Sequence, residues 1–375
     1  MTDLVKVLQI GMTRNIGGLE TYLMQQFDNI DANKLHYDFV NITSESDIVY
    51  KDKIQEKGSK VYGICSRHKN PIKHYYQWIK LLCETKGEYK AIVLNSNSLV
   101  YIFPLFAASI FGIPMRVIHS HNAGHEVKTS LVRKTVISIN KILMKISATH
   151  YLACSQKAGK WMFGNERKFQ IVHNAIDPVP YIFNKEKRDR VREYLNIKDK
   201  FVIGHVGRFT YQKNHKAVID IFKEIVSIKK DSVLFLIGDA VGDTSFLDNA
   251  KLQVKELGIE DKVLFMGMRT DVSDLMQAMD VFILPSRFEG LGIVGIEAQT
   301  SGLPCYFSNN IPQELGVTNL CHYIGIDVSP DVWAHEILNT SLVKRYDMSK
   351  EIAEAGYDIK TEIKNVERFY TQSEQ

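Results

Sequence analysis

Two glutamates eight positions apart, Glu289 and Glu297, mark the stretch of the chain best suited to chemistry. The apolar run Val281–Pro285 predicts a buried strand, and Ile293–Ser301 predicts a helix. Glu289 then lies in the turn at the carboxyl end of the strand. Glu297 lies within a mostly apolar helix, where a carboxylate needs a partner, although the alternative of an ordinary solvent-facing residue stays open. A carboxylate can accept two hydrogen bonds, so both residues suit the vicinal hydroxyls of a sugar.

The turn between the two glutamates also suits a phosphate group. Main-chain N–H groups at the start of a helix carry a partial positive charge and attract anions. Here these groups belong to Leu291, Gly292 and Ile293. The turn and the helix together therefore suit a ligand that carries both phosphate and sugar hydroxyls.

Two basic residues follow the first strand of the second half. Phe201–Val206 predicts a buried strand, and Arg208 and Lys213 come in the loop at its carboxyl end. Two fixed cations in such a loop could hold a diphosphate and neutralise it as a leaving group. Exposed basic residues in loops are usually just solvated. The position of both at the end of a strand favours the binding interpretation.

A glycine pair, Gly17 and Gly18, opens the first helix after the strand Val5–Ile10. Two consecutive glycines let an anion approach the backbone at a helix N-terminus. Their spacing fits neither the dinucleotide-binding fingerprint nor the P-loop. A tight turn between strand and helix is therefore at least as consistent with the pattern as a phosphate-binding turn.

The composition excludes several classes of protein. The chain has 375 residues, 45% of them hydrophobic, and a formal net charge of +4, which is too near balance to indicate nucleic-acid binding. Five scattered cysteines suggest neither a disulfide framework nor a zinc site. The N-terminus does not resemble a secretory signal, and Ala91–Met115, the one uncharged stretch of membrane-spanning length, is broken by Asn, Pro and Gly residues. A cytoplasmic protein is expected.

The elements that would position these residues repeat along the chain. Short β-rich runs alternate with helical stretches, pause at the proline-containing segment Asp177–Pro180, and then resume. This pattern predicts an α/β protein with two Rossmann-like domains facing across a cleft. The expected domains are residues 1–176 and 177–353, with a C-terminal helix of about 354–375 returning to the first domain.

The motifs, taken in order, resemble retaining glycosyltransferases of the GT-B fold, of the family-four class that includes bacterial capsular and exopolysaccharide enzymes. The most specific element is the E-x(7)-E run from Glu289 to Glu297, supported by Arg208 and Lys213 and by Asn174–Asp177. The resemblance covers nearly the whole chain. It implies transfer of a sugar from a nucleotide-diphosphate donor, with a UDP-sugar expected, to a glycan or polyprenyl-linked acceptor in surface polysaccharide synthesis, without a cofactor.

The resemblance also implies roles for individual residues. Arg208 and Lys213 would hold the diphosphate, with the backbone of Gly17–Gly18 opposite them. The chain contains no D-x-D triplet, so no metal ion is expected and the two cations would replace one. Without a well-placed nucleophile, retention would proceed by attack on the leaving-group face, with the diphosphate acting as base.

The other roles implied by the resemblance concern the sugar, the ribose and the base. Glu297 would bind the donor ribose and Glu289 would lie near the transferred sugar, while main chain at Met268 and Arg269 would contact the base. His121, after a strand of the first half, would lie against the donor sugar. The neighbouring His119 is expected to be structural. The catalytic set expected is therefore the histidine at 121, the glutamate at 289 and the two cations.

A basic amphipathic stretch, 128–147, is a candidate for peripheral membrane contact. Lysines and one arginine alternate there with aliphatic residues, a pattern that can lie on an anionic membrane and would suit a lipid-linked acceptor at the inner face of the cell membrane. The alternative is a surface helix that packs its apolar side inward.

Three other functions remain open from the sequence. Another GT-B enzyme, such as a sugar-nucleotide epimerase or a phosphorylase, would share the fold but release nucleotide diphosphate without an acceptor or require a cofactor lysine. A non-catalytic partner subunit that binds a sugar nucleotide or glycan would have no chemical need for all four charged residues. A nicotinamide-dependent oxidoreductase lacks its glycine fingerprint.

Overall fold

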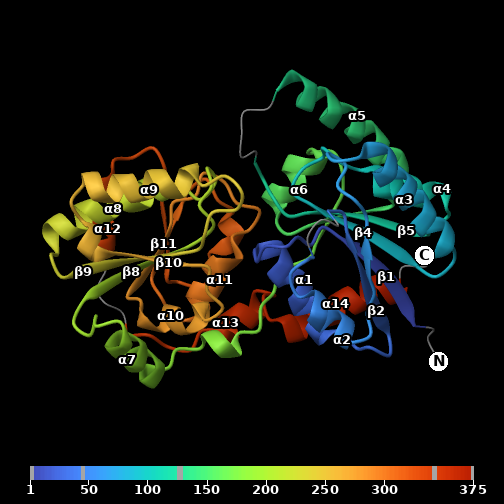
Figure 1. The fold of residues 1–375 in the computed structure, drawn as a ribbon. Helices are drawn as coiled ribbons and strands as arrows, with labels where there is room; N and C mark the ends of the chain where they lie inside the picture. The colour runs from blue at the N-terminus through green and yellow to red at the C-terminus, as the bar shows by residue number, and fades with distance from the viewer. Residues whose placement is uncertain (1–3, 44–46, 125–129, 340–343, 373–375) are drawn as a thin grey trace. The chain divides into compact units, whose positions relative to one another are not determined.

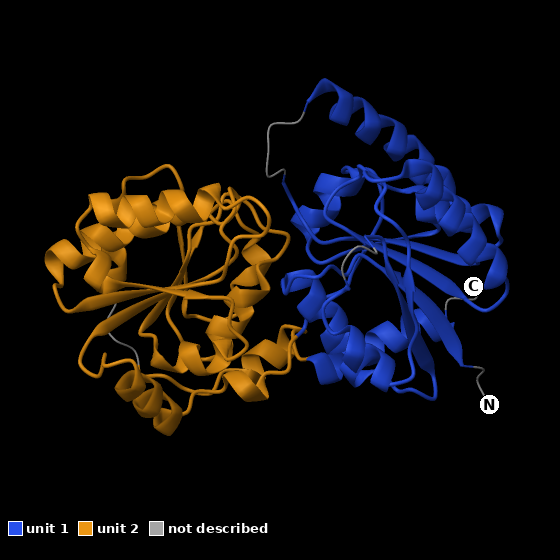
Figure 2. Cartoon of the chain, in the orientation of Figure 1, with its two compact units in different colours: residues 1–175, 359–375 blue, residues 176–358 orange. Residues whose placement is uncertain are grey.

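The chain folds into two compact units in a computed structural model that describes residues 4–43, 47–124, 130–339 and 344–372. Met1–Ala175 and Ile359–Gln375 form unit 1, and Ile176–Asp358 forms unit 2 (Figure 2). The first boundary lies one residue from the position expected from the sequence. The C-terminal helix belongs to unit 1, and its segment begins at Ile359 rather than at about 354.

Unit 1 is built on a seven-stranded parallel sheet with the order β3-β2-β1-β4-β5-β6-β7 (Figure 1). Its strands are β1 (Val5–Ile10), β2 (Leu35–Asn41), β3 (Val61–Gly63), β4 (Ala91–Ser96), β5 (Met115–Ser120), β6 (His150–Ala153) and β7 (Gln170–Ile171). Most residues of the central strands β1, β4 and β5 are buried, because helices cover both faces of the sheet.

The helices of unit 1 form two layers. On one face of the sheet lie α1 (Gly18–Asn29), α2 (Lys51–Glu56) and α14 (Ile359–Gln372), which share one hydrophobic core with the sheet. On the other face lie α3 (Pro71–Glu84), α4 (Phe103–Ile110), α5 (Leu131–Ser147) and α6 (Gln156–Phe163), around a second core. Trp78 of α3 is completely buried there.

Unit 2 is built on a six-stranded parallel sheet with the order β10-β9-β8-β11-β12-β13. Its strands are β8 (Phe201–Val206), β9 (Ser232–Ile237), β10 (Val263–Gly267), β11 (Val281–Leu284), β12 (Cys305–Ser308) and β13 (Cys321–Ile324). Its helices are α7 (Lys185–Tyr194), α8 (His215–Ile228), α9 (Ser245–Glu256), α10 (Val272–Ala278), α11 (Ile293–Thr300), α12 (Pro330–Asn339) and α13 (Ser349–Glu354), with short 3-10 turns at Val179–Tyr181, Glu260–Lys262 and Gln313–Leu315.

Both sheets have the strand order of the doubly wound fold, so each has a point where the order reverses. In unit 1 this point lies between β1 and β4, and in unit 2 between β8 and β11. Ligands of such sheets bind outside the carboxyl ends of the strands at this point, because the loops diverge there and leave a crevice. The two loops that carry Arg208, Lys213 and Glu289 follow β8 and β11, and they therefore meet at the reversal point of unit 2.

The structure corrects several boundaries that periodicity predicts. The apolar run Leu99–Phe111 has helical periodicity, but its helix begins only at Phe103, where Pro104 occupies the first turn. The C-terminal helix is interrupted, because Gly356 has a φ of 86° between α13 and α14. The stretch Ala91–Met115 forms β4, α4 and the start of β5, and no helix in the described ranges is both long and apolar enough to span a membrane.

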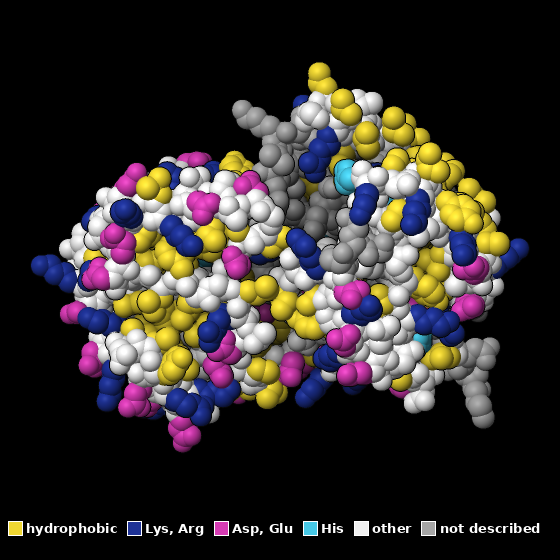
Figure 3. All heavy atoms as spheres, in the orientation of Figure 1, with side chains coloured by type: hydrophobic (Ala, Val, Ile, Leu, Met, Phe, Trp, Pro, Cys, Tyr) yellow, Lys and Arg dark blue, Asp and Glu magenta, His cyan; other side chains and the backbone are white. Residues whose placement is uncertain are grey.

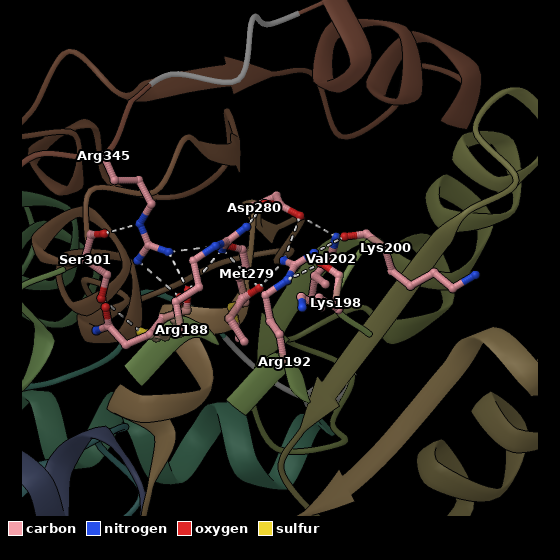
Figure 4. A network of polar contacts seen from close by, with 12 residues as sticks. Arg188, Arg192, Lys198, Lys200, Val202, Met279, Asp280, Ser301 and Arg345 are labelled. Carbon is pink, nitrogen blue, oxygen red and sulfur yellow. Dashed lines mark hydrogen bonds and ion pairs between the residues drawn. The ribbon is translucent and has the colours of Figure 1, made fainter. Parts of the chain in front are cut away.

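A largely buried cluster of arginines surrounds Asp280 at the amino end of β11, the end of the strand opposite the loop that carries Glu289 (Figure 4). Asp280, at the start of β11, accepts from Arg188 at 2.5 Å and from Arg192 at 3.3 Å, and its Oδ2 also accepts from the Val202 backbone at 2.8 Å. Arg345 donates to the backbone of Ser301 and to main-chain carbonyls at the end of α10. The cluster ties α7 and the segment after α12 to the sheet.

Removal of the shared carboxylate should destabilise the protein strongly. In Asp280→Ala, two largely buried guanidinium groups lose their counterion, and this should lower the free energy of unfolding by about 3 to 5 kcal/mol. Asp231→Ala is the matched control, because it breaks only an exposed pair with Lys200, which water screens, and should change the stability little. Urea unfolding of both variants measures the difference, and equal losses would show that the cluster does not stabilise unit 2.

Candidate active site

An ion pair joins the two loops at the reversal point of unit 2. Lys213 Nζ lies 2.7 Å from Glu289 Oε1, and Gln212 Nε2 donates to Glu289 Oε2 at 2.8 Å. The side chains of Lys213 and Glu289 are only 16% and 6% exposed. Both carboxylate oxygens therefore have a donor, and Glu289 is held in one orientation.

Further contacts lock the same two loops together. Asn214 adopts a left-handed conformation with φ 57°, and its Nδ2 donates to Pro285 O at 3.0 Å. Arg287 donates through Nη2 to Asn214 Oδ1 at 3.0 Å, and its guanidinium stacks 4.6 Å above the Tyr211 ring. The Arg287 backbone N–H also donates to Gln212 O at 2.8 Å. The lysine and the glutamate are thus carried by a rigid pair of loops.

The two predicted cations differ in their surroundings. Arg208 is exposed and has no hydrogen bond or ion pair to any residue that the structure describes. Lys213 is mostly buried and already paired with Glu289. Arg208 is therefore the free positive charge at this strand end, while Lys213 shares its charge with a carboxylate.

Gly207 makes room for the lysine. A Cβ atom at this position would lie 2.9 Å from Cδ and 3.0 Å from Cγ of Lys213. The absence of a side chain lets the lysine stem pass directly over the backbone before it reaches Glu289. The glycine before Arg208 is therefore a packing requirement of the ion pair.

The turn after Glu289 leads into α11 through a left-handed glycine. Gly292 caps the helix with φ 94°, a conformation that favours glycine, and a Cβ there would touch Glu289 Cγ at 3.5 Å. Leu291 is buried and Ile293 is partly buried. The predicted main-chain N–H groups are thus at the start of α11, beside the fixed carboxylate.

Glu297 lies inside α11 and is almost completely buried. Burial raises its pKa to about 7, against the opposing effects of a hydrogen bond from Tyr181 and the positive charge of Lys213. The carboxyl group is therefore half protonated near neutral pH. The predicted need for a partner is met by Tyr181, which the sequence did not reveal because it lies more than a hundred residues earlier in the chain.

The residues predicted to contact the base follow β10, at one edge of the unit 2 sheet. Met268 and Arg269 are exposed just after β10, which is an edge strand two positions from β8. The Arg269 guanidinium forms two hydrogen bonds with Asp271, at 2.7 and 2.6 Å. Its side chain is thus directed to a neighbour in the same loop, and the structure does not bring it together with the Lys213 and Glu289 pair.

In unit 1, the glycine pair opens α1 as expected. Gly17 is the N-cap in an extended conformation without a side-chain cap, and Gly18 is the first residue of the helix. Glu20 accepts from the backbone and hydroxyl of Thr13 at 3.1 and 2.7 Å, which fixes the loop between β1 and the helix. The glycines therefore present an open helix start at the reversal point of the first sheet.

His121 follows β5 beside the end of β4. Asn95 Nδ2 donates to Gln9 and Ile10, at 2.9 and 3.0 Å, so its Oδ1 faces His121 Nε2 at 3.1 Å and assigns the ring proton to that nitrogen. His121 Nδ1 remains an acceptor without a hydrogen-bond partner in the described part of the chain. Burial lowers the pKa of His121 to about 3, so the ring is neutral at neutral pH.

His119 is a core side chain within β5. Its Nδ1 lies 3.3 Å from the Tyr22 hydroxyl, which accepts from Gln26 Nε2 at 2.7 Å and so donates to the histidine. The His119 and His121 rings pack with their centroids 4.0 Å apart. His119 therefore packs against the ring of His121 and limits its movement.

Sequence patterns missed the residues that orient these groups. Gln212, Asn214 and Arg287 lie next to the predicted ones, yet an amide or a guanidinium in a loop carries no periodic signal. The described ranges contain no group of three or more His, Cys, Asp and Glu side chains that could hold a metal ion.

A protein-family model matches most of unit 2. Residues 187–355 match the family described as glycosyl transferases group 1. This range includes both predicted cations and both glutamates.

Two bacterial relatives extend the similarity over most of the chain. EpsF of Bacillus subtilis, which is named as a glycosyltransferase, is 27% identical over 94% of this chain and 93% of its own length. The Escherichia coli UDP-Gal:alpha-D-GlcNAc-diphosphoundecaprenol alpha-1,3-galactosyltransferase is 26% identical over 81% of this chain and 79% of its own length.

Solved structures show the same architecture. HepE from Anabaena, in complex with UDP and glucose, superimposes with a TM-score of 0.80 at 19% identity and covers 99% of this chain and 100% of that chain. WaaG, a glycosyltransferase involved in lipopolysaccharide biosynthesis, gives a TM-score of 0.68 at 18% identity, over 99% of this chain and 96% of that chain. At these identities the likeness shows the fold alone. The chain therefore has the GT-B fold, and most of its unit 2 is similar to glycosyl transferases group 1.

Proposed function

We propose that the chain transfers a sugar, with retention at the anomeric carbon and without a metal ion, from a UDP-sugar to a glycan or polyprenyl-linked acceptor in surface polysaccharide synthesis. The observation that carries the proposal is the Lys213 and Glu289 ion pair at the reversal point of the unit 2 sheet, in a loop that also carries Arg208 and lies within the range that matches group 1 glycosyl transferases. The names of the relatives support the finer points: one Escherichia coli relative uses UDP-Gal and a diphosphoundecaprenol acceptor, and HepE binds UDP and glucose.

The two cations would stabilise the departing diphosphate. When the bond between C1 of the sugar and the phosphate oxygen breaks, its electron pair remains on that oxygen, and fixed positive groups lower the energy of this charge. Arg208 has no competing anion among the described residues and can turn toward the ligand. Lys213 is held in place by Glu289, so its position costs no reorganisation when the charge develops.

The fixed orientation of Glu289 bears on retention. Both of its oxygens accept hydrogen bonds, from Lys213 and Gln212, which makes this carboxylate a poor nucleophile. We therefore propose that the acceptor hydroxyl attacks C1 from the face that the diphosphate leaves. Its oxygen forms the new bond to C1, and its proton passes to the departing phosphate oxygen. Glu289 would stabilise the positive charge on the sugar ring.

Glu297 would accept hydrogen bonds from the ribose hydroxyls of the donor. Its burial makes such bonds strong, and its hydrogen bond with Tyr181 fixes the side chain. The contributions predicted for Gly17, Gly18 and His121 of unit 1, and for main chain at Met268, Arg269, Leu291, Gly292 and Ile293, stay predictions.

Loss of either cation should slow the reaction sharply. Arg208→Ala and Lys213→Ala should each lower kcat/KM at least roughly thirtyfold, because each removes one electrostatic donor to the leaving group. This corresponds to a loss of at least about 2 kcal/mol of transition-state stabilisation. The rate of UDP release measures this, with the UDP-sugar that raises the unfolding temperature of the protein most as the donor. Lys216→Ala is the matched control, since it removes an exposed lysine of α8 that pairs only with Asp220. Wild-type turnover by either variant would refute the role of that cation in stabilising the departing diphosphate.

Donor affinity should depend on the ionisation of Glu297. The pKa of about 7 predicts that UDP-sugar affinity rises as pH increases through about 7, because the ionised carboxylate accepts the ribose hydrogen bonds more strongly. UDP-sugar is the suitable probe because its diphosphate does not titrate in this range. In Glu297→Gln the affinity should be weaker at pH above 7 and independent of pH, as measured by calorimetry. A wild-type profile that is flat through neutrality contradicts this role.

The same residue should affect stability in the opposite direction. Its folded-state pKa lies above the unfolded value of 4.5, so the folded state loses stability as pH rises through about 7 and the buried carboxyl ionises. Glu297→Gln should therefore be more stable than the wild type at alkaline pH, by roughly 3 kcal/mol at most. Thermal unfolding at acid and alkaline pH, with exposed Glu351→Gln as control, checks the sign.

Metal removal should leave the enzyme active. Because side-chain cations are proposed to take the place of a divalent ion, EDTA should not change the rate of UDP release. Activity that disappears with EDTA and returns with Mg²⁺ or Mn²⁺ would overturn this part of the proposal.

A further inference from the structure

Helix α5 of unit 1 exposes most of its apolar side chains. Only Met144 and Ser147 of this helix are fully buried, and Ile137 and Leu143 are packed partly against the core. Six other aliphatic side chains are between 36% and 81% exposed. They are Leu131, Val132, Val136, Ile139, Ile142 and Ile146. Inward packing of an ordinary surface helix therefore does not account for the apolar character of α5.

The exposed residues form one stripe with a basic edge. At about 100° per residue, the six aliphatic residues fall within an arc of about 140° on the outer side of the helix. Exposed Lys134, Lys141 and Lys145 line one edge of this arc, at spacings of seven and four residues. The opposite edge is the packed side, where Asn140 Nδ2 donates to Leu99 O at 2.7 Å. Helix α5 contains no acidic residue.

A second stripe continues the pattern on α3. Ile72, Tyr76 and Ile79 recur at helical spacing and are 82%, 65% and 40% exposed, with exposed Lys73 and Lys80 beside them. Helix α4 packs against both α3 and α5 on the same face of the sheet.

Helix α4 contributes Ile110, which is 66% exposed at its end. Figure 3 shows hydrophobic side chains along the edge of unit 1 that α5 and α4 form. We call the exposed apolar and lysine residues of α3, α4 and α5 the basic apolar face. A surface of this kind on a folded domain marks an interaction site.

We propose that the basic apolar face docks on an anionic membrane surface, with α5 lying in the plane of the headgroups. The aliphatic stripe would enter the boundary with the acyl chains, and the lysines would reach back to anionic headgroups along their flexible stems. A second copy of the chain fits less well, because α5 has no acidic side chain to compensate the lysines of a partner. Of the stretch 128–147 expected to contact a membrane, residues 128 and 129 lie outside the described residues.

The docking deepens the proposed function, because a polyprenyl-linked acceptor is carried by a membrane. Only the biological role of the docking rests on the proposed function, and the docking itself does not. Vesicle binding requires neither donor nor acceptor, so each can fail without the other.

Co-sedimentation of the full chain with vesicles tests the docking. The protein should bind vesicles that contain about a third phosphatidylglycerol and bind pure phosphatidylcholine vesicles at least about tenfold more weakly, because about 1 kcal/mol per lysine comes from the anionic surface. High salt should reduce the binding to anionic vesicles. Absence of binding to anionic vesicles at low salt would end the proposal.

Variants locate the contact on the basic apolar face. Ile139→Glu combined with Ile142→Glu should lower vesicle binding at least about tenfold, and Lys134→Glu combined with Lys141→Glu should abolish the preference for anionic lipid. Leu252→Glu is the matched control, because this residue of α9 in unit 2 is 53% exposed, the same as Ile139. All variants should keep the wild-type unfolding temperature, which shows that they are folded.

Two outcomes would overturn the assignment. One is vesicle binding by the isoleucine variant equal to that of the wild type. The other is a wild-type dimer in light scattering that the isoleucine variant dissociates, since a second copy would then cover this face.

Discussion

The Lys213 and Glu289 ion pair is the interaction on which the candidate site depends. It joins the loops after β8 and β11, which come together only because the order of strands in the unit 2 sheet reverses between them. The pair is mostly buried, so its lysine and carboxylate are fixed before any ligand arrives. The space for it comes from Gly207, and its surroundings are held by Arg287 and Asn214. Arg208, in the same loop as Lys213, has no ion pair with any residue of the described ranges.

Burial shifts the pKa of a polar group near the reversal point in each unit. Burial keeps His121 of unit 1 unprotonated, with an acceptor nitrogen left over after the hydrogen bond to Asn95. Burial also brings the pKa of Glu297 in unit 2 to about 7. Such groups are costly in a core, and strongly shifted pKa values concentrate at functional sites. The arginine cluster around Asp280 supplies stability at the other end of the same sheet.

The sequence predicted the strands and turns that carry the site more fully than the contacts within it. The predicted runs Val5–Ile10 and Phe201–Val206 coincide with strands, because strands that are buried on both faces are rich in apolar residues. Between Asn29 and Ala91 no elements were predicted, whereas the structure has β2, α2, β3 and α3 there. The partners of Glu289 and Glu297 could not be predicted, because hydrogen bonds across tens of residues leave no local pattern. The exposure of the aliphatic stripe of α5 could not be predicted either. Periodicity shows that the apolar residues share one side of a helix, but not whether another element packs against that side.

The most direct test of the account is a crystal structure of the protein soaked with a UDP-sugar. The account predicts that the diphosphate oxygens lie within hydrogen-bond distance of the Arg208 guanidinium and the Lys213 ammonium group, with the ribose at Glu297 and no metal ion on the phosphates. A diphosphate bound away from both cations, or held by a divalent ion in their place, would contradict it.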